Sequence, residues 1–315
     1  MTVVNLLLGA WTAVVLLFLY GPILVLAVAS VNQSVNNNRW EGLTGQWYQI
    51  LWYGSLLELK ENVSAGEAWY ARWPRAALDS MGADVATDRL NAIRAGLPIT
   101  FRNRITASVG EIVRSMFNSL LIAGVVTLVA TALGTTAAWL LHRFRYPFSR
   151  FLNTLVAVPM IVPEIILGVS LLILFAALSI GLGYTTVILA HITFCFPYVM
   201  LTVQARLAGL DPSLEEAAMD LGATPLVAFW KVIVPYLLPA IVSGALMAFT
   251  LSMDDFVVTY FTYSARAKTF PIEVYGSVRF PNPLIPTVST LLVGLTAVLV
   301  VASELLRARG SAKAV

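Results

Sequence analysis

Long hydrophobic runs separated by short polar segments dominate the chain. Six runs lie at 6–31, 116–141, 151–177, 184–206, 235–262 and 287–306. A helix needs about 20 mainly apolar residues to cross the hydrocarbon core of a bilayer, and each run reaches that length. The pattern predicts an all-α integral membrane protein with six transmembrane helices. An even number of spans places both termini on the same side.

The first run is not typical of a cleaved signal peptide. It lacks a basic segment before it, and it is longer than the roughly 7 to 15 residues of a signal-peptide core. Ala27-Val28-Ala29 is a poor cleavage site. We therefore expect residues 1–31 to form a retained first transmembrane helix.

Composition excludes a soluble protein. The chain is 58% hydrophobic and 12% charged, with a mean hydropathy of +0.81, and a soluble domain could not bury that much apolar surface. The net charge of +3 comes from bases in short loops and near helix ends, so it does not indicate nucleic-acid binding. Cys195, the single cysteine, excludes an intrachain disulfide and a cysteine-based metal site.

Basic residues set the predicted orientation. Eight of them flank the loops and the tail on one side: Arg143, Arg145, Arg150, Arg206, Lys231, Arg307, Arg309 and Lys313. Three lie in the short loops on the other side: Arg266, Lys268 and Arg279. The positive-inside rule places the first set, and both termini, in the cytoplasm. The segment 32–115 is too long to contribute to this rule, and we place it outside the membrane on the periplasmic side.

The loop 211–230 predicts two short helices that meet at a glycine. Ser213 and Glu216 form an S-x-x-E capping box, while Asp211 followed by Pro212 is an alternative cap. Gly222 suits the left-handed position that ends the first helix. Thr224 and Pro225 begin the second helix. Further on, Pro235 and Pro239 mark the return into the membrane.

Glu216-Ala217-Ala218, followed by Gly222, Ile233, Pro235 and Pro239, resembles the EAA loop of type I ABC importer permeases. The resemblance implies the type I transmembrane-domain fold and a loop that docks on a separate ATPase. The residues it assigns to coupling are Glu216, Ala217, Ala218, Asp220 and Gly222. The alternative is an ordinary amphipathic hairpin. If the loop couples, then Glu216→Ala or a bulky residue at 222 should uncouple ATP hydrolysis from transport.

The chain has no nucleotide site or metal-ligand cluster of its own in sequence. It contains no G-x-x-x-x-G-K-[ST] phosphate loop, and its two histidines, His142 and His191, lie in different segments. We expect a transport subunit that is not an enzyme, has no catalytic residue and has no cofactor. ATP and Mg²⁺ would be bound by the partner ATPase. His191 is interpreted as a packed, hydrogen-bonded group rather than a proton relay.

Three acidic residues lie in predicted spans away from the cytoplasmic end of the last run, where charge is costly and usually functional: Glu164, Asp254 and Asp255. Asp254 shares a helical face with Ser243, Met247 and Thr250, and Asp255 should point about 100° away on the same helix. Glu164 and the aspartates should lie at different depths. Carboxylates along a pathway favour a cationic solute. Alternatively, they cap broken helices or pair with a base of a partner permease.

The sequence around these acids is similar to the spermidine/putrescine permeases, in particular to the second permease of such importers. The similar stretches are 162–172, 190–198 and 249–258, and the resemblance extends over most of 1–55 and 116–307. It implies a polyamine substrate, a periplasmic polyamine-binding protein, a second permease, two ATPase copies and the bacterial inner membrane. Rivals are a permease for another organic or metal-complexed ion, an ion-gradient-driven transporter using Glu164 and Asp254, and a membrane scaffold.

The predicted organisation has four parts: the first span at 1–31, a periplasmic segment at 32–115, a core permease domain at 116–307 and a tail at 308–315. The second part is longer than the resemblance predicts, with an insertion at about 56–110. Leu78, Met81, Val85, Leu90 and Ile93 approximate one face of a helix there. The insertion is either a docking surface for the binding protein or a helical hairpin with aromatic residues at the membrane interface.

Overall fold

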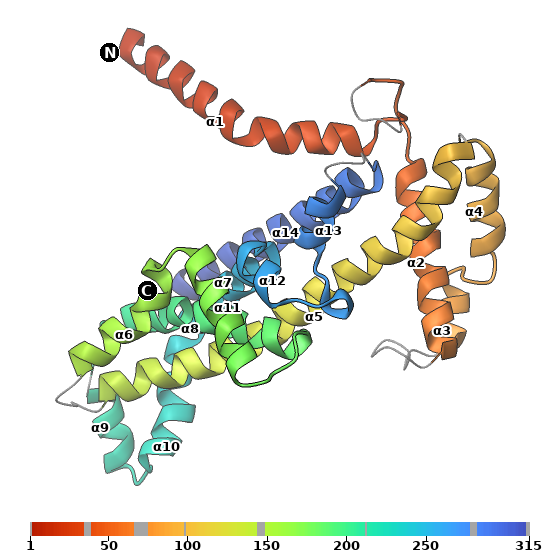
Figure 1. The fold of residues 1–315 in the computed structure, drawn as a ribbon. Helices are drawn as coiled ribbons and strands as arrows, with labels where there is room; N and C mark the ends of the chain where they lie inside the picture. The colour runs from red at the N-terminus through yellow and green to blue at the C-terminus, as the bar shows by residue number, and fades with distance from the viewer. Residues whose placement is uncertain are drawn as a thin grey trace. The chain divides into compact units, whose positions relative to one another are not determined.

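The computed structural model describes residues 2–34, 39–65, 75–97, 99–143, 149–211, 213–277 and 282–312. The regular structure in these ranges is helical, and an isolated bridge joins Asn32 to Leu43 (Figure 1). Contacts divide the chain into two compact units. The first consists of Met1–Arg114 and Glu273–Leu295, and the second of Ser115–Ile272 and Thr296–Val315. The helical fold class is confirmed.

Helix α5 runs from Ile99 to Arg143 and α14 from Leu284 to Ala312, so each contributes to both units. The other helices of the first unit are α1 (Thr2–Ser30), α2 (Gln46–Ala65), α3 (Arg75–Ser80), α4 (Ala86–Ala95) and most of α13 (Phe270–Ser277). Those of the second unit are α6 (Ser149–Ile161), α7 (Glu164–Ala177), α8 (Tyr184–Leu207), α9 (Ser213–Asp220), α10 (Pro225–Ala228), η2 (Phe229–Ile233), α11 (Val234–Asp254), α12 (Val257–Thr262) and η3 (Ala265–Ala267).

Several helices are suited to crossing a membrane. Three described segments are long and apolar enough to do so: Ser108–Arg143, Tyr184–Leu207 and Pro225–Asp254. The pair Phe151–Ile161 and Glu164–Ala177 makes a fourth span if counted together. There are also two shorter apolar helices. Val14–Ser30 lies within the first predicted run, and Leu284–Val298 overlaps the last one. The chain is a multi-pass membrane protein, and the count of six spans stays a prediction.

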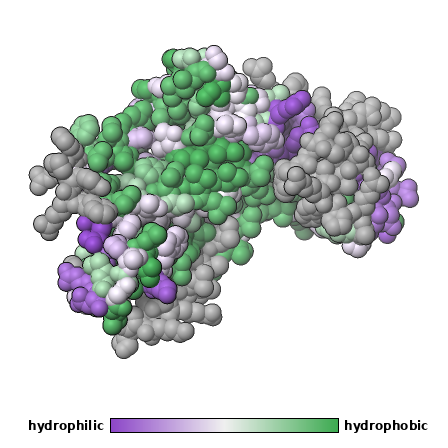
Figure 2. Space-filling model, turned by 90° about the horizontal axis from the view of Figure 1, so that it is seen from below, coloured by the Kyte–Doolittle hydropathy of each residue, from purple (hydrophilic) through white to green (hydrophobic). Residues whose placement is uncertain are grey.

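The second unit is built around α5, α8 and α11. Its core is apolar and includes Ile122, Val126, Ala130, Val199, Met200, Val203, Leu237 and Ala248. Large apolar side chains also cover its outside, such as Leu128, Phe151 and Ile161. Figure 2 shows hydrophobic residues over a broad area of the face that it draws. Hydrocarbon chains are a suitable neighbour for such a surface, whereas water is not.

The run predicted at 151–177 is not one continuous helix. α6 ends at Ile161, α7 begins at Glu164, and the two are bent by 104°. Pro163 explains the break, because it has no N–H to donate and disfavours helical geometry at the residue before it. After the bend, α7 packs against α12. The bend therefore brings Glu164 toward the fifth predicted run.

The run predicted at 235–262 is also broken. α11 ends at Asp254, Asp255 is extended with φ −62° and ψ 123°, and α12 begins at Val257. The prediction that Asp255 lies on the same helix as Asp254, about 100° further round, is wrong. It occupies the joint between two helices. Its side chain is free to bond the exposed N–H groups at the start of α12.

At its start, α11 continues from a widened turn. η2 is a π-helical turn, and the N–H of Val234 donates to the carbonyl of Phe229, five residues back. Pro235 follows directly, and a proline inside a helix removes one hydrogen bond and clashes with the carbonyl four residues earlier. The π turn gives that ring room within a continuous helical path from Pro225 to Asp254. Pro235 is accommodated near the helix start, as predicted.

In the first unit, α2 packs against α3 and α4 around a small core. Fully buried side chains on these helices are Trp47 and Ile50 on α2, Leu78 on α3 and Leu90 on α4. The predicted face of residues 78–93 is only partly right, because the chain turns at Gly82 (φ +96°) between α3 and α4. Met81 and Val85 lie in this turn region and are exposed, whereas Leu78 and Leu90 are in the core. Trp69 and Trp73 lie outside the described residues.

Candidate functional site

A pocket of about 300 Å³ opens where the two broken spans meet. It is lined by residues from α6, α7, α8, α11 and α12 and from the two breaks: Pro159, Met160, Val162, Glu164, Leu167, Phe194, Tyr198, Leu251, Asp254, Asp255, Phe256, Val257 and Val258. All three predicted pathway acids are among them. The expectation that Glu164 and the aspartates lie at different depths is wrong, because the bend at Pro163 brings α7 beside α12.

The charges of this pocket have one sign. Glu164, Asp254 and Asp255 are acidic, and none of the described residues lining it is Lys, Arg or His. The aromatic rings of Phe194, Tyr198 and Phe256 contribute to the same wall. Carboxylates form charge-assisted hydrogen bonds with ammonium groups, and aromatic faces attract cations. The pocket is therefore suited to an organic cation with an apolar chain.

The two adjacent aspartates have different environments. The Asp254 side chain is exposed at the end of α11, and Glu164 is exposed at the start of α7. The Asp255 side chain is only 5% exposed. Its Oδ2 accepts the backbone N–H of Thr259 at 2.8 Å, and its Oδ1 accepts that of Val258 at 3.3 Å. Asp255 thus caps α12, which is the alternative role considered for these acids.

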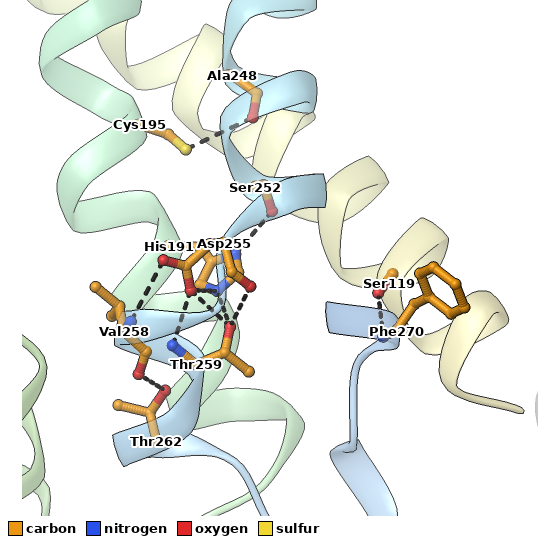
Figure 3. Close-up of polar contacts among 10 residues, drawn as sticks. All are labelled: Ser119, His191, Cys195, Ala248, Ser252, Asp255, Val258, Thr259, Thr262 and Phe270. Atoms are coloured by element: carbon orange, nitrogen blue, oxygen red, sulfur yellow. Dashed lines mark hydrogen bonds and ion pairs between the residues drawn. The ribbon is translucent and has the colours of Figure 1, made fainter. Parts of the chain in front are cut away.

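His191 of α8 joins this cap (Figure 3). Its ring is fully buried, with Nε2 at 2.8 Å from Thr259 Oγ1 and 3.3 Å from Asp255 Oδ2. Nδ1 lies 2.8 Å from Ser252 Oγ on α11. The prediction of a packed, hydrogen-bonded histidine is confirmed. Sequence reasoning missed its partners, because Ser252 and Thr259 are ordinary residues until the helix break brings them together.

The loop after α8 has the two short helices that the sequence predicts, α9 and α10. Of the two predicted caps, Asp211 is used, since its Oδ1 accepts the N–H of Ser213 at 2.9 Å. This backbone hydrogen bond lowers the pKa of the Asp211 carboxyl. Gly222 has φ +88°, and the N–H groups of Gly222 and Ala223 donate to Met219 and Ala218. These bonds form the Schellman ending expected of a glycine at this position.

The predicted coupling residues lie mostly on the surface of this loop. Glu216, Ala217, Asp220 and Gly222 are exposed, and Ala218 is half-buried. Apolar residues are exposed beside them, with Leu221 90% exposed and Leu226 and Trp230 each 63% exposed. A helical loop with bare small and apolar side chains is suited to docking on another protein.

An ion pair that the sequence did not reveal fixes α9 to the end of α5. Arg143 Nε lies 2.6 Å from Glu215 Oε1, and the Glu215 side chain is only 13% exposed. The same guanidinium is 3.9 Å from the sulfur of Met219. On the other side of the loop, Arg206 lies over the ring of Tyr236, 4.3 Å from its centroid. Sequence alone does not distinguish Glu215 from its neighbour Glu216, because the partner of Glu215 lies 72 residues earlier in the chain.

The family model described as binding-protein-dependent transport system inner membrane component matches residues 109–308. The putrescine transport system permease protein PotI of Escherichia coli (strain K12) is 36% identical over 296 residues, which cover 90% of this chain and 86% of that protein. The spermidine/putrescine transport system permease protein PotC of the same strain is 31% identical over 304 residues, covering 96% and 94%.

A second PotC protein, from Haemophilus influenzae, is 29% identical over 299 residues and 95% of each chain. Among solved structures, an amino acid ABC transporter aligns with a TM-score of 0.49 and 16% identity, over 68% of this chain and 99% of that one.

Proposed function

The chain belongs to the family of binding-protein-dependent transport system inner membrane components, and from this premise we propose that it imports a polyamine, putrescine or spermidine. It is a membrane-embedded transport subunit, and ATP hydrolysis belongs to a separate subunit. This family membership excludes the ion-gradient-driven transporter and the scaffold. The substrate is the part of the proposal that requires its own argument.

The acidic pocket is the main observation that supports a polyamine as the substrate. Two exposed carboxylates, Glu164 and Asp254, face a cavity with aromatic and aliphatic walls. A polyamine has ammonium groups joined by methylene chains, and each ammonium that leaves water needs a charged partner. Asp255 adds negative charge behind them. Relatives named as putrescine and spermidine/putrescine permeases support the same substrate class.

The loop 211–230 carries the proposed coupling to the ATPase. In this proposal, Glu216, Ala217, Ala218, Asp220 and Gly222 contact the ATPase, whose closure alternates the pathway between inward-facing and outward-facing states. Exposed Leu221 and Trp230 supply apolar contact area. Two ATPase copies bind the ATP and Mg²⁺, a second permease completes the pathway, and a periplasmic binding protein delivers the polyamine. The chain lies in the bacterial inner membrane with both termini in the cytoplasm.

ATPase activity of the purified importer tests the proposal. The complex, with its binding protein, is placed in lipid nanodiscs and titrated separately with spermidine, putrescine and the neutral sugar maltose. Stimulation of ATP hydrolysis by an amine and not by maltose is the expected result. Stimulation by neither amine would retain the importer family and overturn the substrate, leaving another organic or metal-complexed ion as the alternative.

A further inference from the structure

One side chain spans the break between α11 and α12. His191, from α8, contacts Ser252 in the last turn of α11 through Nδ1 and contacts Thr259 of α12 through Nε2. Asp255, at the joint itself, lies 3.3 Å from the same Nε2. Figure 3 shows these four residues gathered around the joint. A single imidazole is thus bonded on both sides of the place where the helix axis breaks.

Hydrogen-bond accounting fixes the direction of these contacts. Thr259 Oγ1 has one hydrogen, and it donates that hydrogen to Asp255 Oδ2 at 2.7 Å. At the 2.8 Å contact with Thr259, the donor must then be His191 Nε2–H. In the imidazole with one proton, Nδ1 accepts the hydroxyl hydrogen of Ser252. Each polar atom of the cluster has a partner that matches it, so the arrangement is specific.

Packing alone does not account for this histidine. The ring lies in a fully buried position beside Phe194, where an apolar side chain would avoid the cost of removing two nitrogens from water. The hydrogen bonds of His191 do fix the joint that directly follows Asp254. Asp254 is the last residue of α11, directly before the joint, and its exposed side chain lines the pocket.

We infer that His191 is a positioning residue which, with Asp255, Ser252 and Thr259, holds the joint open so that Asp254 faces the pocket. This inference rests on the proposed function, because it assigns His191 a role in cation transport that acts through Asp254. His191 itself does not contact the substrate in this assignment. Asp255 belongs to the same positioning group while its charge still contributes to the pocket.

A double-mutant cycle separates positioning from general stabilisation. Uptake of labelled spermidine by the complete importer is measured for His191→Phe, Asp254→Asn and the double variant. His191→Phe should lower uptake about tenfold, the effect of one lost charge-assisted hydrogen bond. The double variant should be no worse than Asp254→Asn alone, because His191 acts through that carboxylate. Losses that multiply would overturn the inference.

Two conservative variants keep the test independent of misfolding. Glutamine reaches about as far as Nε2 and can still donate to Thr259, whereas asparagine reaches only the Nδ1 position near Ser252. His191→Gln should retain most uptake and His191→Asn should lose it. Equal, unimpaired uptake by both would count against a bridge across the joint. Thr193→Val is the matched control on α8, since its hydroxyl donates only within that helix, to Leu189 at 2.9 Å.

A labelling measurement distinguishes failure of the inference from failure of the proposed function. In a Cys195→Ala background, Asp254→Cys supplies a single thiol, which a small cationic methanethiosulfonate reagent labels from the pocket. Adding His191→Phe should slow this labelling several-fold, because residue 254 then turns away. If labelling depends on His191 while the unmodified importer transports no amine, the positioning role of His191 is supported and the polyamine substrate is rejected. If His191→Phe leaves the labelling rate unchanged, the positioning role is rejected, whatever the substrate is.

Discussion

At the residue scale, two adjacent aspartates have different roles: one faces the pocket and the other caps a helix. Asp254 is exposed at the pocket, whereas Asp255 is buried and accepts two backbone N–H groups, those of Val258 and Thr259. The difference arises because the helix ends between them. In an unbroken helix both would be side chains on one cylinder, 100° apart. Their contributions to transport and to stability should therefore separate.

Replacing Asp254 by Asn should impair transport and leave the fold intact. The amide keeps the size of the side chain but removes the charge that pairs with an ammonium group. We expect uptake of spermidine to fall at least about tenfold, the scale of one charge-assisted contact. Copurification of the ATPase with this chain should be unchanged. Wild-type uptake across a range of amine concentrations would remove Asp254 from the pathway.

Replacing Asp255 by Ala should instead destabilise the protein. The change leaves the backbone N–H groups of Val258 and Thr259 and the hydroxyl of Thr259 buried without their carboxylate acceptor. We expect a loss of about 1–3 kcal/mol in the free energy of unfolding, measured as a lower Tm of the purified complex. Asp254→Ala is the matched control and should leave Tm nearly unchanged. Equal Tm values for the two variants would contradict the capping role.

At the element scale, the ends of helices determine where the functional residues lie. Pro163 ends α6 so that α7 can pack on α12, and Gly222 ends α9 so that α10 can turn back. Thr224 then caps α10, with its hydroxyl accepting the N–H of Val227. These helix ends determine where the acidic pocket and the exposed loop 211–230 form. The Arg143–Glu215 ion pair connects that loop to α5.

Removing this ion pair should weaken coupling more than ATPase binding. Glu215→Gln leaves the exposed docking face of α9 unchanged but releases the half-buried guanidinium of Arg143. We expect fewer amines transported per ATP hydrolysed, about twofold to fivefold, in keeping with a partly buried pair. The charge swap Arg143→Glu with Glu215→Arg should restore part of the ratio. An unchanged ratio in Glu215→Gln would limit the pair to a local stabilising role.

At the scale of the whole molecule, each unit has its own core. In the first unit, Trp47 and Ile50 of α2, Leu78 of α3 and Leu90 of α4 are fully buried, and the second unit is built around α5, α8 and α11. For the insertion at about 56–110, the docking surface for the binding protein and the helical hairpin at the membrane interface both stay predictions, which deletion of 58–108 would distinguish. Because its helices cover the core residues of α2, deleting it would also expose that core.

A core substitution tests whether the first unit has a stability of its own. Leu90→Ala removes a fully buried side chain and should cost about 2–5 kcal/mol. We expect protease cleavage within 58–97 to accelerate while the ATPase still binds at the loop 211–230. Met81→Ala is the control, because Met81 is already exposed. Loss of ATPase binding together with faster cleavage would indicate that the two units unfold as one.

The sequence alone determined the helical membrane class, the loop of α9 and α10 and the three acidic residues, because hydropathy, glycine and proline act over a few neighbouring positions. It predicted Gly222 at the end of α9 and Thr224 at the start of α10 for that reason. Only the tertiary structure decided that Glu164 and Asp254 share a pocket, that Asp255 is a cap bonded to His191, and that Glu215 pairs with Arg143. These are contacts between residues distant in the chain or across a helix break, and they depend on how the helices bend and pack.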